Sequence, residues 1–147
     1  MPLGIPETMK EEHEELHSEL TKATRIPGPV GRAAKTVAEV LHPHFEKENE
    51  LALPIIGIIR ELGEGKASND FLKAAELFDR FRPEYDNMLR EHIEVVSALE
   101  RLEVAARKGR RAGVLKFAQK LKSHARLEED LTYPAVLMAG KLLKQQQ

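Results

Sequence analysis

Residues 44–54 read HFEKENELALP, and residues 124–134 read HARLEEDLTYP. Both segments follow the pattern His-x-x-x-Glu-x-x-Leu-x-x-Pro. A second match lies upstream of each segment, where residues 9–13 read MKEEH and residues 88–92 read MLREH. A repeat of apolar residues alone is common in helical proteins, but this one retains histidine and glutamate as well. The sequence therefore predicts an internal two-fold repeat, in which a lone histidine is followed by a His-x-x-x-Glu pair in each half.

Around these segments the chain divides into four helical stretches, because apolar residues recur with helical spacing between breaks of glycine and proline. A capping-box signature at Thr8 and Glu11 predicts where the first helix begins. Pro83 leaves two readings of the third stretch open, one bent helix or a short helix followed by a longer one. We expect a single all-α domain over residues 1–147, folded as an up-down four-helix bundle. The expected helices cover about 8–25, 30–62, 70–107 and 111–143, and the repeat halves about 8–62 and 83–143.

Composition excludes several classes of protein. The net charge is −1, with 23 Lys and Arg against 24 Asp and Glu, so we expect neither a nucleic acid nor an anionic membrane as partner. The absence of cysteine excludes disulfides, thiolate zinc sites, iron–sulfur clusters and a cysteine nucleophile. The longest apolar run, residues 51–59, is broken by Pro54 and Gly57 and is too short to span a bilayer. With no signal peptide in residues 1–10, a soluble cytoplasmic protein is expected.

The spacing of the histidines and carboxylates suits a metal site. Residues at i and i+4 share a helix face, so each His-x-x-x-Glu pair can point a nitrogen and an oxygen donor in the same direction. Burying two carboxylates without cations costs several kcal/mol per charge, and a pair of divalent metal ions removes that cost. Imidazole and carboxylate together suit iron, manganese or zinc. The sequence predicts a two-metal site on the bundle axis, with candidate ligands His13, His44, Glu48, His92, His124 and Glu128.

A seventh candidate is His17, one helical turn after His13. Its counterpart in the repeat is Val96, which cannot bind a metal. If His17 is a ligand, one metal has three imidazoles and the other has two, and the metal with two keeps an open position for a small molecule. The alternative is that His17 is a solvated histidine. Tyr133 either approaches the site or packs in the core, and Glu129 is interpreted as part of a solvated face.

Taken together, these motifs resemble the hemerythrin-like family, which is known for its His-His-Glu pattern, over nearly the whole chain. The resemblance implies a four-helix bundle holding two irons, bridged by an oxo or hydroxo oxygen and by two carboxylates. The oxygen carriers of that family have a His-x-x-x-His pair on the third helix, whereas here that spacing occurs on the first. The carriers also use a His-x-x-x-x-Asp spacing on the fourth helix, which reaches Glu129 here, while the repeat favours Glu128 as the bridge.

Three functions are compatible with this reading, beside a metal-free structural bundle. The first is a non-haem di-iron protein that binds oxygen or a related small molecule for carriage, storage or sensing. The second is a di-iron enzyme acting on peroxide or nitric oxide, and the third is an iron-responsive regulatory module that signals to a separate protein. The residues do not separate these functions, and they identify neither a redox partner nor an oligomeric state.

Overall fold

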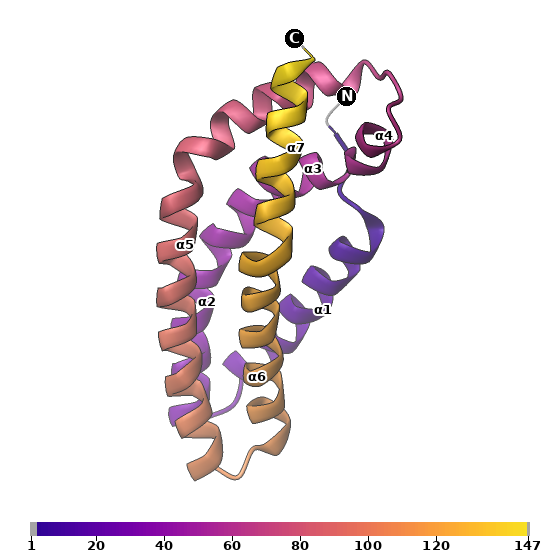
Figure 1. Ribbon diagram of the computed structural model, residues 1–147. Helices are drawn as coiled ribbons and strands as arrows, with labels where there is room; N and C mark the ends of the chain where they lie inside the picture. Colours follow the sequence, from indigo (N-terminus) through magenta and orange to yellow (C-terminus); the bar gives the residue numbers. More distant parts are fainter. Residues whose placement is uncertain (1–2, 147) are drawn as a thin grey trace.

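The computed structural model describes residues 3–146, and these residues form helices joined by short turns (Figure 1). None of the helices in this part of the chain is long and apolar enough to cross a membrane. Two of the elements, η1 and η2, are π-helices. The elements are α1 (Glu7–Thr24), α2 (Pro29–Lys47), η1 (Glu48–Ala52), α3 (Leu53–Ile56), α4 (Ile59–Gly63), α5 (Asp70–Lys108), α6 (Ala112–Leu127), η2 (Glu128–Thr132) and α7 (Tyr133–Gln145).

Four rods make up the helical bundle, as the sequence predicts. They are α1, the run α2–η1–α3, α5, and the run α6–η2–α7. Successive rods run in opposite directions, and the turns at residues 25–28 and 109–111 lie at the same end (Figure 1). Contacts join α1 to α2, α2 to α5, α5 to α6 and α6 to α1, which closes the ring of rods around one axis.

Prolines shape the second and fourth rods. Pro43 lies inside α2 without ending it, whereas Pro54 and Pro134 stand in the first turn of α3 and α7. A proline ring clashes with the carbonyl four residues earlier in a regular helix, and it has no N–H to donate. In both rods a π-turn precedes the proline, with the N–H of Leu53 or Tyr133 bonded to a glutamate carbonyl five residues back. Such π-turns occur frequently at functional sites.

The first helix begins earlier than the sequence predicts. α1 begins at Glu7 after Pro6 and has no side-chain cap, so the capping box predicted from Thr8 does not form. Thr8 lies inside the helix because the chain enters it one residue earlier than expected. In the third rod, α5 is one continuous bent helix with Pro83 inside it, which decides between the two readings left open (Figure 1).

Apolar side chains form two separate core clusters along the bundle axis. The first includes Leu20, Val37 and Leu99 and lies toward the turns at 25–28 and 109–111. The second includes Phe81 and Val136 and fills the opposite half. Apart from Glu103, the buried histidines and glutamates of the rods fall between the residues of these two clusters. They therefore form a polar layer inside the bundle with apolar packing on both sides.

Candidate metal centre

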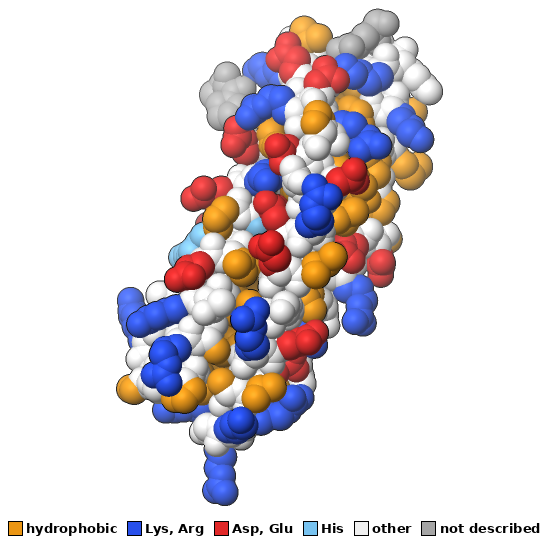
Figure 2. Space-filling view, turned by 90° about the vertical axis from the view of Figure 1, so that its left-hand side faces the viewer, with side chains coloured by type: hydrophobic (Ala, Val, Ile, Leu, Met, Phe, Trp, Pro, Cys, Tyr) orange, Lys and Arg blue, Asp and Glu red, His pale blue; other side chains and the backbone are white. Residues whose placement is uncertain are grey.

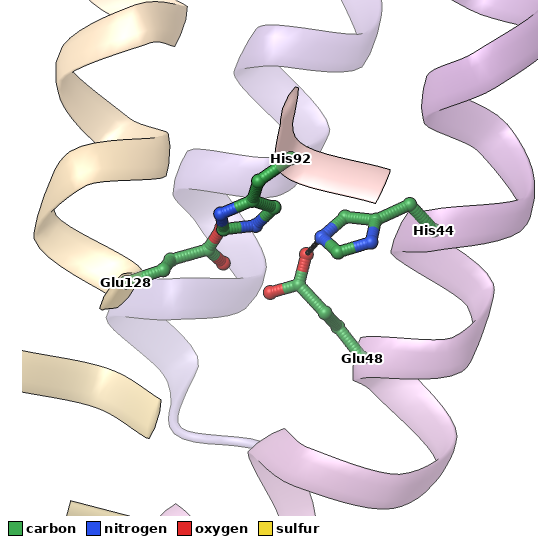
Figure 3. Close-up of side chains that lie close together, drawn as sticks. All are labelled: His44, Glu48, His92 and Glu128. Carbon is green, nitrogen blue, oxygen red and sulfur yellow. Dashed lines mark ion pairs between the residues drawn. The ribbon is translucent and has the colours of Figure 1, made fainter. Parts of the chain in front are cut away.

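Six of the seven predicted ligands come together in the polar layer. They form two groups, and within each group the candidate ligand atoms lie within 4.8 Å of one another. Figure 3 shows the four side chains of one of these groups, in which carboxylates and imidazoles from three rods point toward one another. Each of the six residues in the two groups has an exposed fraction of 9% or less. The first group is His44, Glu48, His92 and Glu128, and the second is His13, His124 and Glu128.

Glu128 belongs to both groups, and its two oxygens face different histidines. Oε1 lies 3.2 Å from Nε2 of His92. Oε2 lies 3.3 Å from Nε2 of His124 and 4.0 Å from Nε2 of His13. A carboxylate that presents one oxygen to each of two imidazole groups is arranged to bridge two cations.

Glu48 is the most deeply buried acid of the site, with none of its surface exposed. Its Oε1 lies 2.9 Å from Nε2 of His44, yet neither of its oxygens has a partner with hydrogen-bonding geometry in the described part of the chain. Burial, followed by the charge of Glu128, raises the pKa of Glu48 well above its usual range. Nε2 of His124 also lacks such a partner. A divalent cation fits these unpartnered donors, because its charge would offset the cost of ionising Glu48.

The other acid of the pair, Glu128, is ionised in the metal-free protein. Burial opposes its ionisation, but the neighbouring Glu48 carboxyl and the His124 and His92 nitrogens outweigh burial and lower its pKa. The pKa values of two histidines in the first group are also shifted in opposite directions. Burial lowers the pKa of His44, whereas contact with Glu128 overcomes burial at His92 and raises its pKa. The pKa values of the two carboxyls are thus shifted in opposite directions, as expected for like charges held close together.

Three carboxylates outside the two groups hold the histidine rings in place. Glu91 lies 2.8 Å from Nδ1 of His44, and Glu129 lies 3.0 Å from Nδ1 of His92. On the other side, Glu12 lies 2.7 Å from Nδ1 of His124. A carboxylate on Nδ1 keeps the proton there and leaves Nε2 free to bind a metal.

These outer carboxylates were not identified from the sequence. The sequence predicts a solvated face for Glu129, and its side chain is indeed 43% exposed although it contacts His92. Glu12 and Glu91 had no assigned role. A signal was present for both, because each immediately precedes a matched histidine at the same position of the predicted repeat.

Tyr133 is fully buried, and its hydroxyl lies beside two histidines of the first group. Its Oη is 3.1 Å from Nε2 of His44 and 3.1 Å from Nε2 of His92. Burial, together with the nearby Glu48 and Glu128, raises the pKa of the phenol, so it stays protonated in the metal-free protein. Of the two roles that the sequence left open for this residue, the structure places it at the site.

His17 is the one predicted ligand that the structure does not bring to the site. Its side chain is exposed, and its ring lies 4.8 Å from the ring of His42 on α2. The physical reason is the direction of the α1 face, since the fully buried residue at this level of α1 is Leu16. His13, one turn earlier, is held inside by stacking on Phe45 with a ring distance of 4.4 Å.

Comparison with known proteins agrees with this geometry. The family model described as the hemerythrin HHE cation-binding domain matches residues 5–136. No curated protein and no solved structure matches the chain. The matched range contains all four rods up to the start of α7 and every residue of both groups. On this evidence the chain belongs to the hemerythrin HHE cation-binding domain family.

Proposed function

We propose that this chain is a non-haem di-iron protein that binds oxygen or a related small molecule for carriage, storage or sensing. The observation that carries the proposal is the position of Glu128, whose two oxygens face two separate groups of histidines. With a bound pair of irons, the site would supply a redox-active centre to which a small diatomic molecule or peroxide can bind. Manganese and zinc suit the same donors, so the identity of the metal is part of the proposal.

The two groups offer different numbers of donors. His44, Glu48, His92 and Glu128 form a four-residue group, while the second group has three residues, His13, His124 and the shared Glu128. A metal with fewer protein ligands keeps more positions for other molecules. We infer that the small molecule binds on the side of His13 and His124. This inequality comes from Glu48 and not from His17, because His17 is exposed.

We also propose that the predicted repeat extends to the structure, with halves at about 8–62 and 83–143. Both π-helices begin at the glutamate of a His-x-x-x-Glu pair, at Glu48 and at Glu128. Glu12 and Glu91, which match in the repeat, each hold a histidine of the His-x-x-x-Glu pair on a neighbouring rod. These pairings support a two-fold relation between the halves around the centre.

The proposal is tested by loading the protein with ferrous iron under argon and recording the visible spectrum as oxygen is added and then removed. A band that appears with oxygen and disappears on its removal supports reversible binding. A band that persists or bleaches to a ferric product supports the alternatives, a peroxide or nitric oxide enzyme or an iron-responsive module. No retained iron would contradict the two-iron proposal.

A matched pair of variants on α1 shows whether the signal comes from this site. His13→Ala removes a buried member of the second group, whereas His17→Ala removes an exposed histidine one turn away. We expect His13→Ala to reduce the iron content and the oxygen-dependent band, and His17→Ala to leave both unchanged. Equal effects from the two variants would mean that the site does not have the geometry described above.

A further inference from the structure

The positive charges of this chain are gathered at one end of the bundle. Residues 20–38 and 104–119 together hold nine of the 23 Lys and Arg and none of the 24 Asp and Glu. These segments surround the turns at 25–28 and 109–111, and Lys and Arg side chains dominate the same end in Figure 2. Although the net charge of the whole chain is only −1, the surface at this end is strongly basic, and such a surface raises the local concentration of anions.

A hollow of about 610 Å³ opens at this basic end, between the last turn of α1 and the start of α6. Its walls include the apolar side chains of Ile26, Val114 and Phe117. Its volume lies within the range of small-molecule sites, which combine apolar walls with a few polar groups. The hollow is separate from the metal centre, because none of the residues that line it belongs to either histidine group.

Three cationic side chains line the hollow: Lys22, Arg110 and Arg111. None of them makes an ion pair with any residue between 3 and 146, so their charge is available to a ligand. Glu19 is the one acidic residue of the lining, and it lies 3.8 Å from Nζ of Lys120. The lining therefore carries a net positive charge above an apolar wall.

Arg110 has an unusual backbone conformation at the edge of the hollow. Its φ is +56°, and it is the only non-glycine residue of the described chain with a positive φ. The N–H of Arg111 bonds to the carbonyl of Ala106 and the N–H of Arg110 to that of Arg107, so α5 ends in a Schellman motif. The left-handed position of this motif is usually glycine, because a side chain there is strained. This backbone position places Arg110 in the lining of the hollow beside Arg111.

We propose that this hollow binds a small organic anion, in which a carboxylate or phosphate head is joined to an apolar body. The head would lie against Arg110, Arg111 and Lys22, and the apolar body against Ile26, Val114 and Phe117. Charge-assisted hydrogen bonds from guanidinium groups suit such a head, and burial of the apolar body adds affinity that a bare anion lacks.

The test measures binding of decanoate to the full chain by titration calorimetry at low salt, with decanol and inorganic phosphate as comparison probes. We expect decanoate to bind more tightly than either, because decanol lacks the anionic head and inorganic phosphate lacks the apolar body. If phosphate binds as tightly as decanoate, the apolar wall contributes nothing and the proposal is wrong. Binding to anionic lipid vesicles without any binding of free decanoate would also overturn it, in favour of a membrane-docking surface.

Three variants show whether the hollow itself is responsible. Arg110→Gly removes a cation and relieves the backbone strain, so we expect about tenfold weaker decanoate binding with an unchanged or higher melting temperature. Arg111→Gln should weaken binding similarly without touching that conformation. Lys108→Gln is the matched control, since this exposed lysine lies at the same end but does not line the hollow. If the Lys108 variant loses as much affinity as the others, binding reflects only the positive electrostatic potential of this end of the bundle, and the proposed site does not exist.

Discussion

Replacing each buried carboxylate of the metal centre by its amide should have unequal effects. Glu128→Gln changes the residue shared by both histidine groups, whereas Glu48→Gln changes a residue found in the first group alone. Glutamine keeps the size and much of the shape of glutamate but is a far weaker metal ligand. The geometry therefore predicts that the Glu128 variant loses both metal ions and that the Glu48 variant loses one.

The size of the effect on thermal stability follows from linkage. A metal ion at about 100 times its dissociation constant stabilises the folded protein by about 2.7 kcal/mol. In a domain of this length each kcal/mol raises the melting temperature by about 2–4 °C, so each ion contributes about 5–11 °C. We expect a metal-dependent shift of about 10–20 °C in the unaltered chain, about half of that in Glu48→Gln and almost none in Glu128→Gln.

The assay combines thermal unfolding, followed by circular dichroism with and without ferrous iron under argon, with a count of bound iron by elemental analysis. Glu103→Gln is the control, because Glu103 is also a buried carboxylate (6% exposed) but is paired with Lys122 outside the site. That variant should lower the melting temperature in both conditions and keep the metal-dependent shift. A Glu128→Gln protein that retains two irons and the full shift would refute the bridging role of Glu128.

Three further outcomes follow from the same geometry. Glu91→Gln should weaken iron binding by about 10–100-fold, measured by competition with a chelator, because it loosens the orientation of His44. Tyr133→Phe should destabilise the metal-free protein by about 1 kcal/mol in urea unfolding, since it removes a buried hydroxyl that contacts His44 and His92. Metal binding should release protons and weaken as the pH falls, because the raised pKa values of Glu48 and His92 favour their protonated forms, from which the metal must displace the proton. Titration calorimetry in buffers of different ionisation enthalpy measures this release, and iron affinity independent of pH would contradict it.

Much of the candidate site could be predicted from the sequence because it depends on local spacing. A histidine and a glutamate four residues apart share a helix face whatever the surrounding fold, so helical geometry predicts that His44 and Glu48 point to the same side, as do His124 and Glu128. The outer carboxylates could not be found by this route. Glu91 contacts a histidine 47 residues away on another rod, and such a contact depends on how the rods pack.

His17 shows where local spacing fails. It stands four residues after His13, which is the same spacing that works for the two His-x-x-x-Glu pairs, yet its side chain is exposed. The axis of a rod and its tilt against its neighbours decide which of two aligned residues reaches the centre, and neither is encoded in a short motif. Pro83 gives a second example, because packing decided that α5 would bend and continue rather than divide.

The all-helical class, the family and the pattern of donors follow from the sequence, since they depend on composition, helical period and motif. Only the packing of the rods places Glu128 against both histidine groups and Tyr133 beside two of the histidines. The same packing brings the basic residues of two distant segments to one end of the molecule. The physical reason is the same in each case. A helix fixes neighbours within a few residues, whereas the meeting of atoms from different rods is fixed by the packing of their apolar faces around one axis.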